Sequence, residues 1–354
     1  MNYDKEVHEA VDLLSRLIAI SRVSRQETEA ADMLETQMKA WGIQANRTGN
    51  NLWEVAPDYD EARPTLLLNA HIDTVKAVSA WTRDPFRPEL TEDGVLYGLG
   101  SNDDGASLVT LLLTYRRLRT VPRNYNLIFL ASAEEEVSGA NGISSVLPLL
   151  PRIDVGLVGE PTGMHPAVAE KGLMVLDVTE HGKAGHAARN EGDNALYHAV
   201  DDILWFRSYH FPDETALLGP VKMTVTIIQA GTQHNVVPDT CTFTVDVRSN
   251  ECYSNQEIYE HACKHVKGEV KARSFRLNSS RISLDHPLAQ RVLQLGRKPF
   301  GSPTLSDQAL MSFPSMKMGP GDSARSHTAD EFIRVAEIKE ALELYHELLS
   351  ELAL

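Results

Sequence analysis

Five acidic and imidazole side chains are placed along the chain so that together they could build a metal centre: His71, Asp103, Glu136, Glu160 and His327. Each follows an apolar stretch or lies in a turn rich in glycine or proline. Two histidines and three carboxylates form a ligand set suited to zinc, cobalt or manganese. A shared carboxylate would hold two ions about 3.5 Å apart, close enough to activate one water jointly. These residue types therefore predict a two-metal hydrolase.

His71 and Asp73 follow the apolar run TLLLNA (65–70). In open α/β sheets ligands gather at the carboxyl ends of strands, so we expect His71 at that crevice. Asp73 is spaced to accept a hydrogen bond from the imidazole and so fix its tautomer. A His-x-Asp pair alone is more often a helix-starting Asp beside a solvated His, so the assignment depends on the other residues.

Asp103 lies in a glycine-rich turn, residues 98–105, that leads into an apolar helix. The turn has some likeness to a dinucleotide-binding loop, but a carboxylate at position 103 would repel a pyrophosphate. As a metal ligand, Asp103 can present one oxygen to each of two ions. An Asn-Asp helix cap explains this motif equally well when it is taken alone.

Three consecutive acids, Glu134, Glu135 and Glu136, follow the apolar run NLIFLA (126–131). Acids directly beyond a buried strand are costly unless a cation neutralises them. We predict that one of Glu135 and Glu136 holds a metal ion while the other takes a proton from the bridging water. For Glu134 we expect a solvated loop, which is the usual setting of a charge run.

Glu160 and His327 are the weakest members of the set. Glu160 stands before Pro161, beyond the run DVGLV (154–158), and His327 lies in a segment rich in turn-forming residues. A histidine in such a loop is more often solvated than ligating. We include both because, like the other three residues, they lie at strand ends or in turns.

The elements that must position these residues alternate strand and helix in the first half of the chain. Two helices open it, over 4–20 and after a candidate capping box formed by Ser24 and Glu27. The continuous apolar runs then predict strands buried on both faces, with a helix over 107–118 between the first two. This pattern predicts an α/β domain with a mainly parallel central sheet and flanking helices.

The patterning changes after position 172. Strands near 221–227 and 241–248 alternate apolar and polar residues, and helices are expected over 194–209 and from Ser254. The order strand, helix, strand, strand, helix, strand is that of a ferredoxin-like α+β domain. We therefore predict a catalytic domain formed by residues 1–172 and 283–354, with an inserted domain at 173–282.

The composition limits the class of partner. The 354 residues carry a formal charge of −15 without a Lys/Arg-rich stretch, which argues against nucleic acid or a membrane and favours a small-molecule substrate. Three cysteines without metal-finger spacing predict a reducing compartment. With no apolar signal core and no run as long as a membrane span, we expect a cytoplasmic protein.

Taken together, these motifs resemble the M20 metallopeptidase family, which contains acetylornithine deacetylase, succinyl-diaminopimelate desuccinylase and glutamate-releasing carboxypeptidases. The resemblance covers nearly the whole chain. It rests on these segments, in this order: NAHIDT (69–74), YGLGSNDD (97–104), SAEEEVSG (132–139), VGEPT (158–162), HGKAGHAA (181–188), HNVVPD (234–239), VDVRS (245–249) and GPGDSARSHTADE (319–331).

The resemblance implies a zinc-exopeptidase-like catalytic domain that binds two divalent ions, with zinc preferred and cobalt or manganese as alternatives. The implied roles are His71 and Glu160 on one ion, Glu136 and His327 on the other, Asp103 as bridge, Glu135 as general base and Asp73 as the residue that orients His71.

The resemblance also implies roles for the inserted domain as a lid and as the site of homodimerisation. His186 corresponds to a family histidine that reaches the substrate carbonyl oxygen, often from the partner subunit, and would stabilise the oxyanion. Asn235 and Arg248 match positions that contact substrate, and the guanidinium of Arg248 suits a substrate carboxylate. Without the resemblance, His186 and Arg248 would be taken for a turn histidine and a surface charge.

The chain departs from the family pattern at two places. The family usually has Lys soon after the bridging Asp, in the pattern Asp-x-Lys-Gly, whereas Asp104, Gly105 and Ala106 follow Asp103 here, so a nearby positive charge is missing. Its Asp-Glu-Glu is replaced by three glutamates, and the following Ser-Gly keeps the register.

The leading functional hypothesis is hydrolysis of N-acetyl- or N-succinyl-L-ornithine to ornithine and a carboxylic acid, as in arginine biosynthesis. Succinyl-diaminopimelate desuccinylase and M20 dipeptidase are the alternatives of the same class. A catalytically silent protein that binds an amino-acid derivative is the alternative from a different class, and it would be expected to have lost a ligand or the base.

Overall fold

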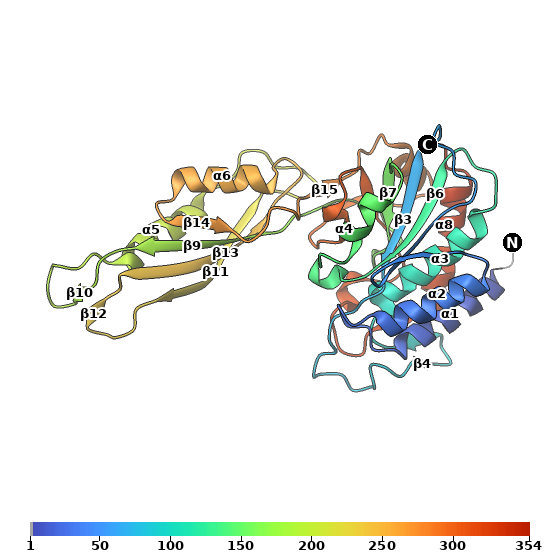
Figure 1. The fold of residues 1–354 in the computed structure, drawn as a ribbon, viewed down its shortest axis with the longest axis horizontal. Coiled ribbons are helices and arrows are strands. Elements are labelled where there is room, and N and C mark those ends of the chain that lie inside the picture. The colour runs from blue at the N-terminus through green and yellow to red at the C-terminus, as the bar shows by residue number, and fades with distance from the viewer. Residues whose placement is uncertain (1–2) are drawn as a thin grey trace. The chain divides into compact units, whose positions relative to one another are not determined.

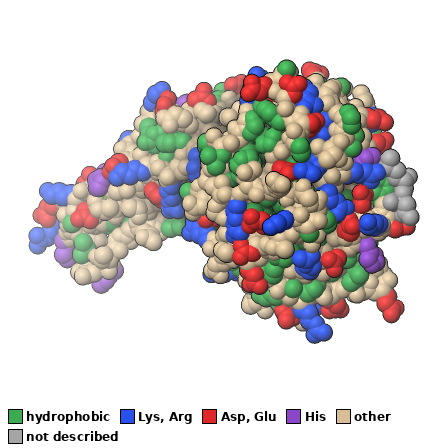
Figure 2. All heavy atoms as spheres, turned by 45° about the vertical axis from the view of Figure 1, so that its right-hand side comes forward, with side chains coloured by type: hydrophobic (Ala, Val, Ile, Leu, Met, Phe, Trp, Pro, Cys, Tyr) green, Lys and Arg blue, Asp and Glu red, His purple; other side chains and the backbone are tan. Residues whose placement is uncertain are grey.

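The computed structural model describes residues 3–354, which form two units. Unit 1 comprises the chain up to Val168, Ile282–Phe300 and Ser306–Leu354, and unit 2 comprises Ala169–Arg281 and Gly301–Leu305 (Figure 1). Acidic and basic side chains are interspersed on the face shown in Figure 2. Within residues 3–354, no helix has the length and apolar character needed to cross a bilayer.

Unit 1 is built on a sheet whose central strands are parallel. The strands follow the order β1-β2-β6-β3-β7-β17-β8; β3 pairs in parallel with β6 and β7, and β17 in parallel with β7, while the outer pairs are antiparallel. The predicted mainly parallel sheet is thus confirmed. Its strands are β1 (Asn46–Thr48), β2 (Asn51–Val55), β3 (Thr65–His71), β6 (Asn126–Ser132), β7 (Val155–Val158), β8 (Ala167–Glu170) and β17 (Ser315–Lys317). A second, three-stranded sheet consists of β4 (Glu89–Leu90), β5 (Val95–Tyr97) and β18 (Phe332–Arg334).

The central strands are apolar throughout because both of their faces are covered. Along β3, Leu66 and Leu68 belong to one hydrophobic core whereas Leu67 belongs to another. Residues alternate between the two faces of a strand, so a strand buried on both sides needs an uninterrupted apolar run. The run TLLLNA therefore encodes a strand in the middle of the sheet.

Helices cover the two faces unequally (Figure 1). One core is formed with buried residues of α1, α2, α3 and α8, and the smaller core on the other face includes Ile143 and Val146 of α4. The helices of unit 1 are α1 (Asp4–Ile18), α2 (Thr28–Ala40), α3 (Ala106–Leu118), α4 (Ile143–Val146), α7 (Pro287–Gln294) and α8 (Val335–Ser350), with short turns η1 (Ser101–Gly105), η2 (Glu135–Val137), η3 (Leu147–Leu149), η4 (Asp307–Leu310) and η5 (Ser323–Arg325).

The predicted capping box of Ser24 and Glu27 is wrong. The N-cap residue of α2 is Glu27, and its side chain makes no capping hydrogen bond. The backbone amide of Ser24 instead donates to the carbonyl of Thr74, and its hydroxyl donates to the carboxylate of Asp73 at 2.6 Å. Ser24 therefore belongs to the surroundings of the candidate site and does not cap the helix.

Unit 2 has the predicted order strand, helix, strand, strand, helix, strand. Its sheet has the order β11-β13-β9-β14 with all neighbours antiparallel, which is the ferredoxin-like arrangement. Ser254 and Glu257 form the capping box that opens the second helix. The elements are β9 (Met174–His181), α5 (Ala195–Ser208), β11 (Lys222–Ala230), β13 (Thr240–Arg248), α6 (Asn255–His265) and β14 (Glu269–Ala272), with a small ribbon of β10 (Gly185–His186) and β12 (Val236–Val237), and the short strands β15 (Ser280–Arg281) and β16 (Phe300–Ser302).

Candidate metal centre

The side chains predicted as metal ligands converge at one end of the central sheet of unit 1. His71 is the last residue of β3, Glu135 and Glu136 follow β6, and Glu160 follows β7. These three strands are neighbours and run parallel, so their carboxyl ends meet at one edge. The turn η1, before α3, and the loop that precedes β18 bring the remaining two residues, Asp103 and His327.

The carboxylate of Asp103 lies between the two histidines. Its Oδ1 is 3.2 Å from Nε2 of His71, and its Oδ2 is 3.7 Å from Nε2 of His327. On the far side, Nε2 of His327 lies 3.0 Å from Oε2 of Glu136. Each oxygen of Asp103 thus faces a different histidine, which is the arrangement that a bridging carboxylate requires.

Two groups of possible ligands share His71. One consists of His71, Asp103 and Glu136 and the other of His71, Glu135 and Glu160; within each group, one ligand atom from every residue lies within 4.8 Å of the others. Imidazole nitrogens and carboxylate oxygens are the donors of catalytic zinc sites in proteins. The donor set therefore fits a pair of adjacent divalent ions.

Burial raises the free energy needed to ionise the carboxyl groups of this cluster. Burial raises the pKa of both Glu135 and Glu160 well above the usual range; the positive charge of His71 opposes the shift for Glu135, and that of Lys317 opposes it most for Glu160. Burial also works against protonation of His71, but hydrogen bonds that the imidazole donates to the carboxylates of Asp103 and Asp73 outweigh it and raise the pKa of His71 well above its ordinary value. A bound cation would favour the ionised carboxylates and the neutral imidazole.

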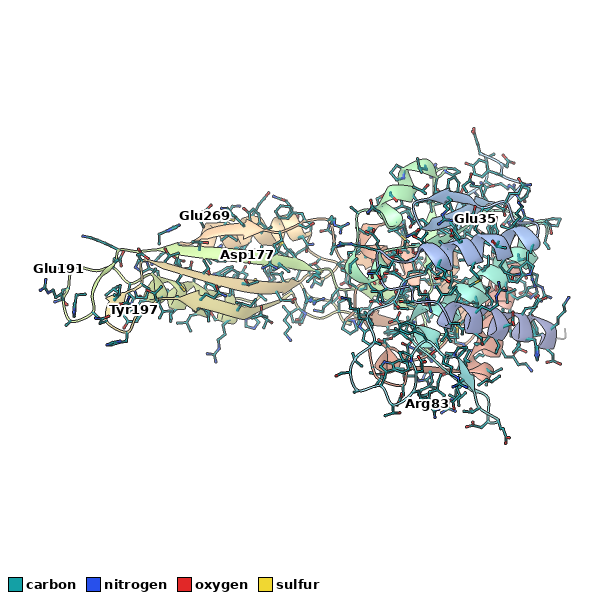
Figure 3. The ribbon with its side chains drawn as sticks, turned by 60° about the horizontal axis from the view of Figure 1, so that its bottom comes forward. Glu35, Arg83, Asp177, Glu191, Tyr197 and Glu269 are labelled. Atoms are coloured by element: carbon teal, nitrogen blue, oxygen red, sulfur yellow. The ribbon has the colours of Figure 1, made fainter. Side chains whose placement is uncertain are left out.

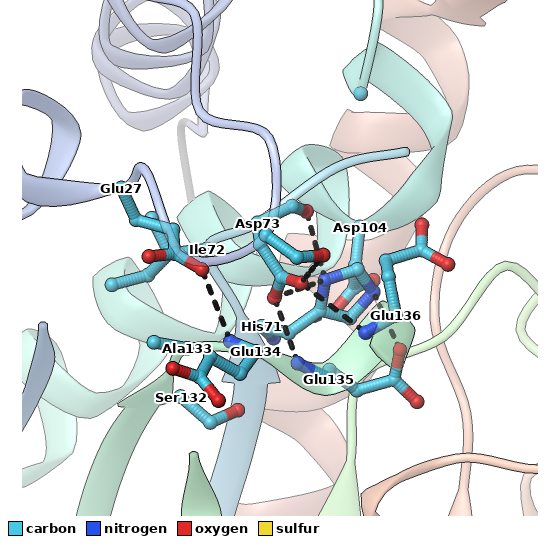
Figure 4. Close-up of polar contacts among 12 residues, drawn as sticks. Glu27, His71, Ile72, Asp73, Asp104, Ser132, Ala133, Glu134, Glu135 and Glu136 are labelled. Carbon is cyan, nitrogen blue, oxygen red and sulfur yellow. Dashed lines mark hydrogen bonds and ion pairs between the residues drawn. The ribbon is translucent and has the colours of Figure 1, made fainter. Parts of the chain in front are cut away.

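Asp73 contacts both His71 and the turn that carries the glutamates (Figure 4). Nδ1 of His71 lies 3.0 Å from the backbone carbonyl of Asp73 and 3.5 Å from its Oδ1. The same carboxylate accepts hydrogen bonds from the backbone amides of Glu135 at 3.0 Å and Glu136 at 3.2 Å. Asp73 thus holds the imidazole through its backbone carbonyl and fixes the glutamate turn through its side chain.

Glu134 is not solvated as predicted. Its side chain is buried and accepts a hydrogen bond from Nδ2 of Asn141 at 3.0 Å, with Nε of Arg25 3.9 Å away. The chain turns back after β6, so the amide of Gly139 donates to the carbonyl of Glu134. A Cβ at position 139 would lie 1.8 Å from the Glu134 carboxylate, so only glycine leaves room for this turn.

Some acids near the cluster, Glu331 and Asp104 among them, were not identified from the sequence. Glu331 accepts hydrogen bonds from the backbone amides of Gly100, Asn102 and Asp103 at 2.8–2.9 Å, and burial raises its pKa to about 7. Asp104 accepts from the amide of His71 at 3.3 Å, and burial raises its pKa to about 7 as well. Glu331 ends the segment GPGDSARSHTADE, but nothing in its local sequence shows that it binds a turn more than 220 residues away.

The three site residues predicted in unit 2 are not together. His186 on β10 and Asn235 before β12 are adjacent, because the amide of Ala187 donates to the carbonyl of Asn235 at 3.0 Å. Arg248 ends β13, and its guanidinium is paired with Asp246 at 2.9 Å. Thr240 lies at the other end of β13 and pairs with His181, close to the β10–β12 ribbon. Because a strand rises about 3.3 Å per residue, the two ends of β13 are far apart. Arg248 therefore lies at the opposite end of unit 2 from His186 and Asn235.

Known proteins resemble the chain over nearly its full length. The sequence model of Peptidase family M20/M25/M40 matches residues 67–351. A succinyl-diaminopimelate desuccinylase of Corynebacterium glutamicum is 26% identical over 96% of this chain and 95% of its own. An acetylornithine deacetylase of Pectobacterium carotovorum is 27% identical over 82% of this chain and 80% of its own.

The fold is shared with solved structures of that family. The YxeP protein of Bacillus subtilis, a dinuclear metal binding peptidase, aligns with a TM-score of 0.73 over 97% of both chains at 17% identity. The family match spans most of the chain and includes the end of the sheet where the ligand groups converge. The chain belongs to Peptidase family M20/M25/M40 and is a metal-dependent amidohydrolase.

Proposed function

We propose that the protein hydrolyses the amide bond of an N-acyl amino acid, with N-acetyl- or N-succinyl-L-ornithine as the leading substrate and ornithine and a carboxylic acid as products, a step of arginine biosynthesis. The observation that carries the proposal is the cluster of His71, Asp103, Glu136 and Glu160 at the carboxyl edge of the sheet, with the carboxylate of Glu135 beside it. This cluster has the ligands and the base that metal-assisted amide hydrolysis requires.

We assign His71 and Glu160 to one ion and Glu136 and His327 to the other, with Asp103 serving both. The two oxygens of Asp103 face different histidines and Glu136 lies beside His327, which supports this assignment. The distances among ligand atoms also place Glu136 in a group with His71 and Asp103. Two divalent ions bound there, with zinc preferred over cobalt or manganese, would polarise the amide carbonyl and make a water nucleophilic near neutral pH.

Glu135 is the proposed general base. Its Oε2 lies 3.9 Å from Nε2 of His71, and its backbone amide is fixed by the carboxylate of Asp73. In the forward reaction Glu135 takes a proton from the attacking water and delivers it to the nitrogen of the leaving amine, so the carboxyl returns to its starting state. Burial, which raises the pKa of Glu135, makes its carboxylate a stronger base, and bound cations would keep that carboxylate ionised until it takes the proton.

Positions 186, 235 and 248 support a site completed by a second copy of the chain. We assign His186 to the substrate carbonyl oxygen and Asn235 and Arg248 to substrate contacts. Eight residue steps along β13 span about 26 Å, much more than the length of an N-acyl amino acid. One substrate cannot contact both ends of the same unit 2, so these roles require His186 and Arg248 from different chains.

A surface of unit 2 favours such a homodimer. The strand β11 is nine residues long and lies at the edge of its sheet, with Ile227 and Ile228 about half exposed. The neighbouring helix α5 exposes Tyr197, which is labelled in Figure 3. Val200 and Leu204 follow it at helical spacing and are exposed as well. A long apolar edge strand beside an apolar helix face is an unprotected pairing surface. We therefore propose that unit 2 pairs with its twin through β11 and α5.

A substrate panel tests the proposed activity. The protein loaded with zinc is assayed for kcat/KM on N-acetyl-L-ornithine, N-succinyl-L-ornithine, N-succinyl-diaminopimelate and a dipeptide. We expect one of the two ornithine derivatives to exceed the others by at least about tenfold, the discrimination that about 1.4 kcal/mol of differential binding provides.

The alternatives give different results in the same panel. A preference for succinyl-diaminopimelate would show a desuccinylase, the activity that names the Corynebacterium glutamicum relative, and a preference for the dipeptide would show a dipeptidase. If the protein with zinc bound hydrolysed none of these substrates, the proposed enzyme activity would be rejected in favour of a binding protein.

A further inference from the structure

A completely buried arginine, Arg22, joins the two loops that carry the proposed metal ligands. Arg22 is 1% exposed and belongs to the segment of the chain that joins α1 to α2. One guanidinium nitrogen donates a short hydrogen bond to the carbonyl of Ile72, and Nη2 donates to the carbonyl of Gly100 at 2.8 Å. Ile72 is the residue next to His71, and Gly100 opens the turn that leads to Asp103. A single side chain thus connects the His71 loop to the Asp103 turn.

The charge of Arg22 is balanced by acids of the same region. Burial of a guanidinium without a directly bonded carboxylate is costly, and burial lowers the pKa of Arg22. The attraction of Glu331, Asp73, Asp104 and Asp103 opposes that effect. Arginine stays charged in such settings, so Arg22 is a fixed cation among carboxylates that would otherwise repel one another.

Gly100 provides the space for the guanidinium, because a Cβ there would lie 2.3 Å from Nη2 of Arg22. A Cβ at Gly105 would lie 2.4 Å from the carbonyl oxygen of Gly100 and 2.6 Å from Leu14, so Gly105 lets the turn pack closely. Gly100 also has φ +73°, a conformation that other residues rarely adopt. Any side chain at position 100 would therefore displace the guanidinium from the carbonyls that it binds.

We propose that Arg22 is a positioning residue of the metal centre, which holds the His71 loop and the Asp103 turn at the separation that two metal ions need. This inference rests on the metal centre proposed above. Among residues 3–354, the hydrogen bonds found for Arg22 go to backbone carbonyls and not to the side chains of the proposed ligands. Its effect is expected on metal affinity, through charge and through the two carbonyls that it binds.

Three substitutions separate the charge of Arg22 from its hydrogen bonds. Arg22→Lys keeps the charge, Arg22→Gln keeps a donor without the charge, and Arg22→Met keeps neither. Arg119→Met is the matched control, because Arg119 forms a largely buried ion pair with Glu54 at 2.7 Å and, among the contacts found in residues 3–354, bonds no loop of the metal centre. Each variant is first checked for native circular dichroism.

Zinc affinity is measured by competition with a chromophoric chelator, and the cobalt form is examined by visible absorption. We expect Arg22→Gln and Arg22→Met to bind zinc about 10- to 100-fold more weakly, the usual effect of removing support for metal ligands, with a changed cobalt spectrum. Arg22→Lys should stay closer to the native protein than Arg22→Gln. Arg119→Met should lower thermal stability and leave affinity and spectrum unchanged.

The outcomes that overturn the inference are distinct from failure of the proposed function. Native zinc affinity in folded Arg22→Gln, or equal affinities in the Lys and Gln variants, would reject the role of the Arg22 charge while the metal centre stands. If Arg22→Met does not fold, the zinc affinities of Arg22→Lys and Arg22→Gln are compared to test the role of the charge. A native protein that binds no zinc would reject the metal centre itself.

Discussion

Glu135 and Glu136 are adjacent in sequence but have different neighbours. Glu136 is paired with His327, whereas Glu135 lies near His71 and has a raised pKa because of burial. We predict that Glu135→Gln lowers kcat by about 10²- to 10⁴-fold, the usual contribution of a general base, with zinc content unchanged. In contrast, Glu136→Gln should lose zinc. Elemental analysis beside steady-state kinetics checks both, and full turnover by the Glu135 variant would remove its assignment as base.

At the same scale, the sequence allowed the prediction of the proposed metal ligands at the edge of the sheet but not of the residues whose hydrogen bonds hold their loops. His71 and Glu160 could be placed because each follows a recognisable buried strand. Arg22 and Glu331 could not, because their partners are backbone groups at Ile72 and Gly100–Asp103, distant in sequence. Glu134 was misassigned because its burial depends on a turn closed by Gly139.

At the scale of elements, buried strands were the most predictable feature of the chain, since a strand covered on both faces needs a continuous apolar run. The ribbon β10–β12 and the sheet β4-β5-β18 were not predicted, because strands of two or three residues carry no periodic pattern. The capping box at Ser24 failed for another reason: that segment bonds to Thr74 and Asp73, so tertiary contacts override the local signal.

The junction between β9 and α5 gives a prediction about pH. The buried carboxyl of Glu180 on β9 is next to Asp202 on α5, and burial together with a hydrogen bond to Asp202 raises the pKa of Glu180 to about 7. In the unfolded chain Glu ionises near pH 4.3. Between about pH 4.5 and 7 the unfolded state loses this proton while the folded state keeps it, so the contribution of Glu180 to stability falls as pH rises.

Glu180→Gln should therefore be more stable than the native protein above pH 7, and the difference between them should shrink as pH falls towards 4.5. Calorimetric melting at several pH values measures that difference, with Glu260→Gln on the exposed side of α6 as the matched surface control. A difference that does not change with pH, or one that equals the control, would contradict the raised pKa.

At the scale of the whole molecule, unit 2 is predicted to dimerise through β11 and α5. Ile228→Lys, which places a charge on the exposed edge strand, should convert the dimer into a monomer in size-exclusion chromatography with light scattering. Leu149→Lys alters an equally exposed leucine in unit 1 and should leave the dimer intact. The Ile228 variant should lose activity as it loses the dimer, because His186 and Arg248 of one site would come from different chains. A monomeric mass for the native protein would contradict the proposed pairing.

The central claim is a pair of divalent ions bridged by Asp103, and the number of zinc ions bound per chain tests it most directly. Equilibrium dialysis of the demetallated protein against zinc, followed by elemental analysis, should give two ions per native chain. His327→Ala should reduce the number to one, because the ligands His71 and Glu160 of the other ion remain. One ion or none in the native protein would contradict the bridged pair.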